Sequence, residues 1–272
     1  MKKTVFITGA SQGLGKTAAK RFATAGWNVI ATMRSPEKEN ELTLLDNVLV
    51  LKVDVQDKAS IEAGIATTIA KYGQIDTFIN NAGYGLFGPF ELASEEQIRA
   101  QFDVNVFGLM AATKAILPHF RANKAGTIIN ISSMGGRVSF PIISLYNATK
   151  FAVEGFTESL RYELADFNIH VKLIEPGVTA TNFDNAANFT SSNDITDYNA
   201  YVNAFLGHWM VLNANPATSE DVVDVIYTAA TDGKDQLRYI ATPDAQLLIN
   251  ARNTKTEEEY LQLMKDRHVP QS

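Results

Sequence analysis

Short apolar runs and longer amphipathic stretches alternate along the chain. Strand-like runs rich in Val, Ile and Thr occupy residues 3–8, 28–33, 48–53, 75–80, 127–132 and 169–175. Between them, apolar residues recur at helical spacing. Strands that alternate with helices are typical of a parallel sheet covered on both faces. No linker, repeat or low-complexity segment interrupts the sequence. We therefore expect an α/β fold, a doubly wound parallel sheet in three layers, as a single domain over residues 1–272.

The first strand runs into a glycine-rich loop that a helix follows at once. Residues 9–15 read Gly-Ala-Ser-Gln-Gly-Leu-Gly, and Gly26 is placed to end the helix. Such a loop directs backbone N–H groups and the positive end of the helix dipole at one point, where a pyrophosphate can bind. The spacing Gly-x-x-x-Gly-x-Gly differs from the familiar Gly-x-Gly-x-x-Gly fingerprint. An ordinary turn is the alternative, and the flanking strand and helix favour the phosphate site.

A tyrosine and a lysine further along the chain suggest proton transfer. Tyr146 and Lys150 are four residues apart, and Ser133 lies thirteen residues before Tyr146. On a helix, this spacing places the lysine ammonium beside the phenol. A neighbouring cation lowers the pKa of tyrosine from its usual value of about 10, which makes the phenol useful as an acid or base. Taken alone, such a pair is also a common surface arrangement.

Composition narrows the functional classes. The chain has no cysteine, which excludes disulfides and thiolate chemistry, and its four histidines are too scattered for a local zinc motif, so no metal site is expected. A net charge of −6 argues against nucleic acid as the main partner. Neither a signal peptide nor a run of membrane-helix length is visible. We expect a cytoplasmic protein with no membrane partner.

These motifs together resemble the single-domain short-chain dehydrogenase/reductase family over nearly the whole chain. The motifs, in the family's order, are Thr8-Gly9-x-x-x-Gly13-x-Gly15, Asn80-Asn81-Ala82-Gly83, Asn105, Ser133, Tyr146-x-x-x-Lys150 and Pro176-Gly177. The resemblance implies a Rossmann-type fold and hydride transfer between a nicotinamide cofactor and a small-molecule carbonyl or alcohol. It also implies a homodimer or homotetramer, with subunit contacts made by the helices predicted near residues 95–120 and 144–167.

The resemblance gives each catalytic residue an expected role. Tyr146 would exchange a proton with the substrate oxygen, which Ser133 would hold by a hydrogen bond. Lys150 would lower the pKa of Tyr146 and bind the nicotinamide ribose. Asn105 would hold a water that links the lysine to solvent protons. Ser132 competes with Ser133, but the thirteen-residue interval to the tyrosine matches the family at Ser133.

The cofactor contacts are likewise implied by the resemblance. The expected cofactor-binding residues are Gly9, Ser11, Gln12, Gly13, Leu14, Gly15, Arg34, Asp54, Val55, Asn81, Ala82, Gly83, Tyr146, Lys150, Pro176, Gly177, Val178 and Thr181. Asp54 would contact the adenine, and residues 81–83 would line the adenosine ribose. Thr181 and residues 176–177 would lie near the nicotinamide, with the backbone at Val178 facing its carboxamide. As bare sequence, both short segments also read as turns.

The end of the second strand indicates which cofactor is preferred. An acidic residue at this position binds a ribose 2′-hydroxyl and repels a 2′-phosphate. Here the sequence is Ala-Thr-Met-Arg, so Arg34 stands where a carboxylate would select NAD(H). A guanidinium binds phosphate through paired, charge-assisted hydrogen bonds. We expect a preference for NADP(H), with NAD(H) possible, because Arg34 could instead be a solvated turn residue and Gln12 replaces a basic residue found in many NADP-dependent relatives.

The substrate is less well defined by the sequence. Residues 179–216 form a long segment that ends in an aromatic and apolar stripe, and segments of this length at the ligand edge often form lids. Such a lid would cover a hydrophobic ketone, aldehyde or alcohol, for example a steroid, retinoid, lipid-derived or aromatic compound. Core packing or a subunit contact would use the same stripe. Residues 84–89 resemble those of family members similar to hydroxysteroid or retinol dehydrogenases.

Two other functions use parts of the same sequence pattern. An epimerase or dehydratase of the same superfamily also uses tyrosine and lysine, but the glycine spacing and the short C-terminal region argue against it. A non-catalytic NADP(H)-binding sensor or scaffold would need only the first part of the site. The presence of Ser133, Tyr146, Lys150 and Asn105 together favours the enzyme.

Overall fold

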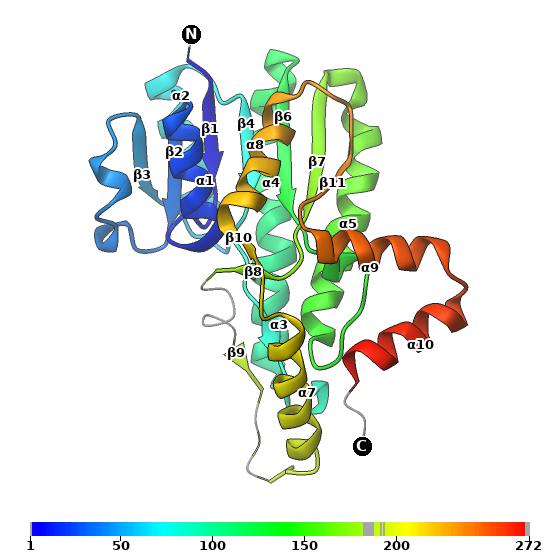
Figure 1. Cartoon of the computed structure of the whole chain (residues 1–272). Coiled ribbons are helices and arrows are strands. Elements are labelled where there is room, and N and C mark those ends of the chain that lie inside the picture. Colours follow the sequence, from blue (N-terminus) through cyan, green and yellow to red (C-terminus); the bar gives the residue numbers. More distant parts are fainter. Residues whose placement is uncertain (1, 182–187, 191, 193, 270–272) are drawn as a thin grey trace.

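Seven parallel strands form the central sheet. They are β1 (Thr4–Ile7), β2 (Asn28–Met33), β3 (Val48–Lys52), β4 (Thr77–Asn80), β6 (Gly126–Ile131), β7 (Ile169–Glu175) and β11 (Arg238–Ile240). Their order across the sheet is β11-β7-β6-β4-β1-β2-β3 (Figure 1). This computed structural model describes residues 2–181, 188–190, 192 and 194–269. The six predicted strands are confirmed, and β11 is a seventh that the sequence pattern did not indicate.

Helices cover both faces of the sheet, which confirms the predicted Rossmann-type three-layer domain. One face carries α1 (Gly13–Thr24) and α8 (Ser219–Thr231), and the other carries α2 (Lys58–Tyr72), α4 (Leu109–Asn123) and α5 (Ser144–Leu164). Further helices in the described part of the chain are α3 (Glu95–Phe102), a π-helix (Asp103–Gly108) that joins α3 to α4, α7 (Asn199–Leu212), α9 (Pro243–Thr254) and α10 (Glu257–His268), besides several three-residue 3-10 helices. Further strands there, each of two residues, are β5 (Leu86–Phe87), β8 (Thr179–Ala180), β9 (Asn188–Phe189) and β10 (Ala217–Thr218).

The core divides into two layers because successive strand residues point to opposite faces. Along β1, Val5 and Ile7 pack toward α1 and α8, whereas Phe6 packs on the opposite face and stacks on Phe78 of β4, with ring centroids 4.9 Å apart. All of these side chains are fully buried or nearly so. The strands are therefore apolar on both sides, as a sheet between two helical layers requires.

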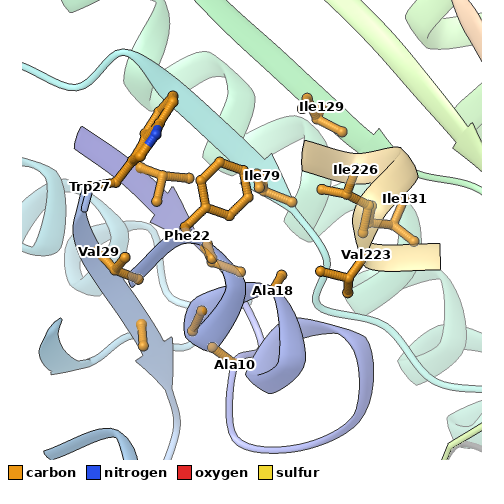
Figure 2. Packing of buried hydrophobic residues seen from close by; sticks show 14 of the residues in the cluster. Ala10, Ala18, Phe22, Trp27, Val29, Ile79, Ile129, Ile131, Val223 and Ile226 are labelled. Atoms are coloured by element: carbon orange, nitrogen blue, oxygen red, sulfur yellow. The ribbon is translucent and has the colours of Figure 1, made fainter. Parts of the chain in front are cut away.

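The layer under α1 and α8 is shown in Figure 2. Phe22 of α1 lies beside Ile79 of β4, and Val223 and Ile226 of α8 lie near Ile131 of β6. The helix residues recur at spacings of three and four, so each helix turns one apolar stripe onto the sheet. This packing fixes the start of α1 at the carboxyl end of β1, which is where the glycine loop lies.

The strand order places the loops that follow β1, β4, β6 and β7 at one edge of the sheet. From β1 the chain adds β2 and β3 on one side of the sheet, and then crosses over to add β4 and β6 on the other side. Ligands of open α/β sheets bind beyond the strand ends at such a switch point, here between β1 and β4. Local signals fix the adjoining helices. Gly26 has a φ of +83° just after α1, and Asp57 caps α2 by accepting a hydrogen bond from the N–H of Ala59 at 2.9 Å.

The predicted lid segment, residues 179–216, contains β8, β9 and α7, and its residues 182–187, 191 and 193 lie outside the described part. Helix α7 projects at the bottom of the view in Figure 1, near the carboxyl edge of the sheet. Its Trp209 packs against the Phe140 ring in an edge-on arrangement, with centroids 5.7 Å apart. No helix within the described residues is long and apolar enough to cross a membrane.

Candidate active site

A cavity of about 630 Å³ opens at the carboxyl edge of the sheet. It is lined by every residue that the sequence predicts for the site except Gly15 and Asn105. The predicted residues on its wall are Gly9, Ser11, Gln12, Gly13, Leu14, Arg34, Asp54, Val55, Asn81, Ala82, Gly83, Ser133, Tyr146, Lys150, Pro176, Gly177, Val178 and Thr181. Residues from segments more than 150 positions apart therefore share one site, and its volume is within the usual range for a ligand pocket.

The glycine loop has the backbone that its sequence requires. Gly9 and Gly13 have φ values of +67° and +54°, which residues with a side chain seldom adopt. A Cβ on Gly9 would lie 2.7 Å from the Cα of Ala82, and a Cβ on Gly15 would clash with the Asn81 side chain and the Gly9 carbonyl. Gly15 thus lets the start of α1 pack closely against the loops after β1 and β4, which explains why it does not line the cavity.

Hydrogen bonds fix this loop to the one that follows β4. The hydroxyl of Thr8 accepts from the N–H groups of Asn81 and Ala82 at 3.0 and 3.1 Å. The Asn81 amide donates to the carbonyl oxygens of Thr8 and Gly9 at 3.0 and 2.9 Å. Gln12, the N-cap of α1, makes no side-chain capping bond, and no acidic residue lies in the first turn. Within the described residues, no capping side chain or first-turn carboxylate therefore occupies the N–H groups at the start of α1.

Arg34 lies at the cavity wall just beyond the end of β2 and is exposed. Among the described residues it forms no ion pair, whereas Lys16 of α1 contacts Glu39 at 3.2 Å and Glu41 at 2.7 Å. The carboxylate of Asp54, farther along the same wall, accepts from the N–H of Gln56 at 3.0 Å. Of the two cations, Arg34 is therefore the one that lines the cavity without a carboxylate partner among the described residues.

Tyr146 and Lys150 lie on one face of α5, as predicted. The Lys150 ammonium is 5.6 Å from the centroid of the Tyr146 ring and donates to the carbonyl oxygen of Ile131 at 2.8 Å. Lys150 is only 8% exposed. Burial lowers its pKa to about 8, while the charge of Glu154 opposes this shift. With that pKa, the side chain is still mostly protonated at neutral pH, so a cation is present beside the phenol.

Ser133 follows β6 and faces the same cavity. Its hydroxyl accepts from the N–H of Gly135 at 3.0 Å and lies 3.5 Å from the Pro176 carbonyl oxygen, to which it donates. The neighbouring Ser132 is 2% exposed, and its hydroxyl lies where a Cβ on Gly136 would clash with it. Ser133 is half-buried and more accessible, so the geometry favours it over Ser132 as the hydroxyl that a substrate oxygen would meet.

Asn105 lies in the π-helix, is buried and is not among the residues that line the cavity. Its amide oxygen accepts from the N–H of Tyr84 at 3.1 Å, and its amide nitrogen donates to the Tyr84 carbonyl at 2.9 Å and to Thr149 at 3.2 Å. The side chain thus holds the loop after β4 against α5. Its predicted role with a water molecule stays a prediction, because that role concerns a molecule beyond these contacts.

The loop after β7 is fixed by residues that sequence reasoning did not identify. The N–H of Gly177 donates to the Thr242 hydroxyl at 2.9 Å, and the N–H of Val178 donates to Asp244 at 2.8 Å. The backbone N–H expected to face a carboxamide is therefore bound to Asp244 here. Thr242 and Asp244 begin α9, more than 60 residues away in sequence, so no local signal connects them with this loop.

One wall of the cavity is apolar. It contains Met134, Phe140, Ile143, Val178 and Trp209, which belong to or pack against one apolar cluster; Phe87 also lines the cavity. Phe140 and Ile143 lie between Ser133 and Tyr146 in sequence, which was the one available signal for them. Trp209 stacks on Phe205 within α7, with centroids 5.7 Å apart, and Phe205 is 4% exposed. This part of the aromatic stripe forms cavity wall and local packing together.

Two comparisons with known sequences agree on the type of protein. The family model described as short chain dehydrogenase matches residues 3–191. The chain is 38% identical over 240 residues to the uncharacterized oxidoreductase YusZ of Bacillus subtilis, covering 85% of each chain. It is 39% identical over 203 residues to the 3-ketodihydrosphingosine reductase of Bacteroides thetaiotaomicron, covering 74% of this chain and 72% of that one.

Solved structures show the same fold. A short-chain dehydrogenase from Streptomyces avermitilis superposes with a TM-score of 0.85 at 34% identity, covering 98% of this chain and 97% of that one. A closed serine dehydrogenase complexed with NADP+ gives a TM-score of 0.74 at 32% identity, with coverages of 87% and 94%. A 3-ketoacyl-(acyl-carrier-protein) reductase from Brucella melitensis complexed with NADH gives 0.73 at 26% identity, with coverages of 88% and 94%.

Proposed function

The chain belongs to the short-chain dehydrogenase/reductase family and is an NAD(P)-dependent oxidoreductase, and from that premise we propose that it interconverts a hydrophobic ketone or aldehyde and the corresponding alcohol, with NADP(H) as the preferred cofactor. The observation that carries the proposal is the arrangement of Tyr146, Lys150 and Ser133 around one cavity that also contains the glycine loop.

The residues fit a nicotinamide dinucleotide along the length of the cavity. The N–H groups at the start of α1 would hold the pyrophosphate, and Gly9 and Gly13 allow its close approach. Asn81 and Gly83 would line the adenosine ribose. Two of the three Lys150 N–H donors have no acceptor among the described residues, and one of them would bind the nicotinamide ribose.

The catalytic step follows from the placement of the three side chains. Bound nicotinamide supplies or accepts the hydride. Tyr146 donates a proton to the substrate oxygen during reduction and removes it during oxidation, because the nearby charge of Lys150 stabilises the tyrosinate. Ser133 donates a hydrogen bond to the same oxygen once its proton turns from the Pro176 carbonyl, a weak contact at 3.5 Å.

The preference for NADP(H) rests on Arg34. Its guanidinium lies at the adenosine end without an ionic partner among the described residues, and no carboxylate stands at this position to repel a 2′-phosphate. Similar proteins bind NADP+ in one solved structure and NADH in another. The family therefore accommodates either cofactor, and the side chain at position 34 supports the phosphorylated one.

The substrate class rests on the apolar wall near Tyr146. Phe140, Ile143 and Trp209 would enclose the carbon skeleton beside the reacting carbonyl, and each buried CH₂ group adds about 0.8 kcal/mol of binding. A long aliphatic or an aromatic carbonyl compound fits this wall. The name of the reductase from Bacteroides thetaiotaomicron, a 3-ketodihydrosphingosine enzyme, is consistent with such a substrate.

We further propose a homodimer or homotetramer in the cytoplasm. Three large apolar side chains are exposed on the π-helix and α5: Phe107 (58%), Phe151 (45%) and Tyr162 (71%). These side chains lie in the two segments, residues 95–120 and 144–167, that the family resemblance assigns to subunit contacts, where burial against a second copy would cover their apolar surface. Light scattering of the purified protein would give the mass directly, and a monomer at micromolar concentration would contradict this part of the proposal.

The proposal is tested by Tyr146→Phe with Tyr162→Phe as the matched control on the same helix. We expect Tyr146→Phe to bind NADPH normally, by fluorescence titration, and to lose all measurable turnover on a panel of hydrophobic ketones and aldehydes. Tyr162 does not line the cavity, and phenylalanine keeps its ring at the proposed subunit contact, so its variant should keep wild-type rates. Undiminished turnover by Tyr146→Phe would refute the assigned acid. Wild-type protein that binds NADPH but converts no carbonyl compound would favour a sensor instead.

A further inference from the structure

One helical turn after Lys150, α5 carries a second ionisable side chain that does not line the cavity. Glu154 is 4% exposed, and Glu175, the last residue of β7, is fully buried. Both carboxylates contact Arg238 Nε: Glu154 Oε2 at 2.9 Å and Glu175 Oε1 at 3.4 Å. Glu175 Oε1 also lies 3.2 Å from Arg137 Nη1. Two buried carboxylates therefore meet at one guanidinium.

Two of the four carboxylate oxygens in this cluster lack a hydrogen-bond partner among the described residues. Glu154 Oε1 and Glu175 Oε2 are buried and have no hydrogen-bond partner of good geometry among the described residues, although the nearby Ser132 hydroxyl interacts with Glu154 and partly offsets the rise in its pKa. A buried carboxylate oxygen without a donor costs a large desolvation free energy, which a bound proton removes. Burial raises the pKa of Glu175 to about 7, with the charge of Glu154 as the second cause, and burial also raises the pKa of Glu154. Near neutral pH, the two carboxyl groups together thus favour holding one proton.

The cluster is coupled to the catalytic lysine. Lys150 and Glu154 occupy the same face of α5 because they are four residues apart. A Cβ on Gly136 would meet both the Glu154 side chain and the Lys150 carbonyl oxygen, so the lysine's helical turn and the carboxylate pack against one short loop. The charge of Glu154 is also what opposes the effect of burial on the pKa of Lys150.

We propose that Glu154 and Glu175 form a buried carboxyl pair that holds a single proton, and that the negative charge left on Glu154 keeps the Lys150 ammonium charged beside Tyr146. Both are positioning residues, because they act through Lys150 and line no part of the cavity. The proposal rests on the proposed function of Tyr146 and Lys150. The charged side chains that face the pair are Lys150 and Glu158 of α5, Arg137 after the 3-10 helix Met134–Gly136, and Arg238 of β11.

A shared proton makes an unusual prediction about the two glutamines. If the pair holds one proton, Glu154→Gln and Glu175→Gln each leave one negative charge, and only its position changes. In Glu154→Gln the charge moves away from Lys150, and in Glu175→Gln it stays entirely on Glu154. Glu154→Gln should then shift the acidic limb of the pH profile of kcat for alcohol oxidation to higher pH by roughly 0.5–1 pH unit, because the charge beside Lys150 is lost. Glu175→Gln should leave the limb where it is in the wild type.

If both carboxylates were ionised, the pH profiles would differ from this expectation, because Glu175→Gln would then remove a negative charge near Lys150. Both variants would shift the limb to higher pH, and that result would overturn the proposal. Glu158→Gln is the matched control: Glu158 contacts Arg238 and lies on α5, but its side chain is 47% exposed, so the limb should not move. An equal shift in Glu158→Gln would show a general charge effect and would also overturn the proposal.

The protonation state of the carboxyl pair can also be measured in the folded wild-type apoprotein, which requires neither turnover nor a variant that folds. Infrared spectroscopy at pH 7 should show the C=O stretch of a protonated, buried carboxylic acid, which vanishes as the pH rises. Absence of this band refutes the shared proton even if the protein is an active reductase. Conversely, a band together with full activity in Tyr146→Phe would keep the carboxyl pair and reject the proposed function.

Discussion

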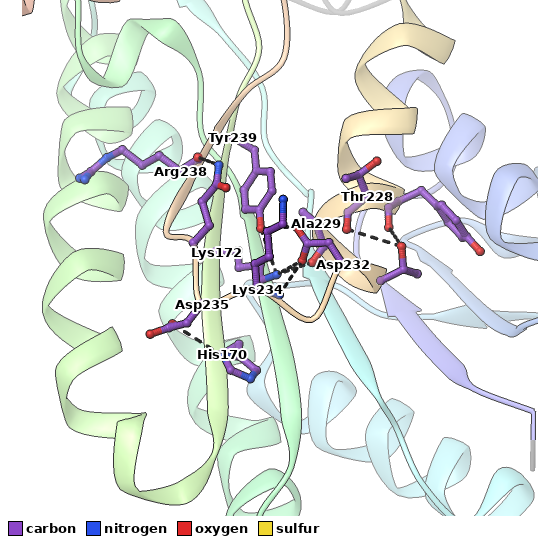
Figure 3. Close-up of polar contacts among 12 residues, drawn as sticks. His170, Lys172, Thr228, Ala229, Asp232, Lys234, Asp235, Arg238 and Tyr239 are labelled. Atoms are coloured by element: carbon purple, nitrogen blue, oxygen red, sulfur yellow. Dashed lines mark hydrogen bonds and ion pairs between the residues drawn. The ribbon is translucent and has the colours of Figure 1, made fainter.

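Two buried lysines in this protein have opposite surroundings. Lys172, in the middle of β7, is 2% exposed and donates to the Ala229 carbonyl at 2.7 Å, to Asp232 at 2.8 Å and to the Tyr239 hydroxyl at 3.1 Å (Figure 3). Lys150 of α5 donates to one acceptor among the described residues, the Ile131 carbonyl. An ammonium has three N–H donors. All three are satisfied in Lys172, and two remain available in Lys150.

This difference indicates that Lys172 is a structural cation and that Lys150 is available to a ligand. The Tyr239 hydroxyl donates in turn to Asp232 at 2.7 Å, so Lys172 belongs to a closed network that joins β7, β11 and α8. Burial and the Asp232 carboxylate both raise the pKa of Tyr239, which keeps that hydroxyl protonated. Lys150 instead carries a cost of burial that Glu154 only partly offsets, and it lines a ligand cavity with two donors that have no acceptor among the described residues. An incomplete hydrogen-bond set around a buried charge therefore marks the functional site here.

The largest expected effect is the loss of activity in Lys150→Met. Removing the charge beside Tyr146 and a ribose donor should lower kcat by roughly 10²–10⁴-fold. Unfolding should cost more in the variant, by about 1–3 kcal/mol at pH 7, because the folded protein no longer buries a charge. Since the pKa of Lys150 falls from 10.5 to about 8 on folding, this gain should be complete below pH 8 and vanish as the pH rises toward 10.5. Steady-state kinetics and urea denaturation give both quantities, and a destabilised variant would contradict this account.

Lys172→Met should show the reverse pattern. Its removal leaves the carboxylate of Asp232 poorly exposed to solvent and without its cation, which costs about 3–5 kcal/mol of stability. The folded fraction should retain its kcat, because the network lies away from the cavity wall. The double variant Lys172→Met with Asp232→Leu should recover part of the lost stability. A double variant no more stable than the single one would show that packing, and not an unpaired charge, accounts for the loss.

The sequence predicted the place of Lys150 in the site, but it did not predict the buried hydrogen-bond networks around Lys172 and Glu154. Lys150 belongs to a local motif, and the six predicted strands follow from continuous apolar runs. Glu154 occupies a helix position that reads as a solvated polar residue, and its burial depends on Arg238, 84 residues away. Strand β11 escaped prediction for the same reason: it has three residues, and Arg238 and Tyr239 extend to opposite sides toward partners on α5 and α8 (Figure 3). Contacts that tertiary structure alone creates leave no periodic signal.

His268 is another buried ionisable group, and like Lys150 it has unused hydrogen-bonding atoms among the described residues. His268 of α10 is 3% exposed, and neither ring nitrogen is hydrogen-bonded within the described residues. It packs edge-on against Phe140, with centroids 5.1 Å apart. Burial lowers its pKa from 6.5 to about 4. Above pH 6.5 the residue is neutral in both folded and unfolded protein, so stability is unaffected there.

As the pH falls from 6.5 toward 4, His268 binds a proton in the unfolded chain but stays neutral in the folded protein. The protein should lose about 3 kcal/mol over this interval from this residue. His268→Phe keeps an aromatic ring beside Phe140 and should remove that loss. The matched control is His170→Phe, because His170 is partly exposed and lies near Asp235. Thermal unfolding at pH 4.5 and pH 7 measures the difference, and equal acid sensitivity in wild type and His268→Phe would refute the assignment.

The smallest predicted effect concerns the same contrast between paired and unpaired cations at the adenosine end. Lys16 is held by Glu39 and Glu41, whereas Arg34 has no ionic partner among the described residues. A charge-assisted hydrogen bond to phosphate contributes about 1.5–3 kcal/mol, so Arg34→Ala should weaken NADPH binding by roughly 10- to 100-fold and leave NADH within about twofold. Lys16→Ala should change both affinities about equally, because its charge is already neutralised. Fluorescence titrations with the two cofactors measure the ratio, and an equal loss of NADPH and NADH in Arg34→Ala would mean that the guanidinium does not recognise the 2′-phosphate.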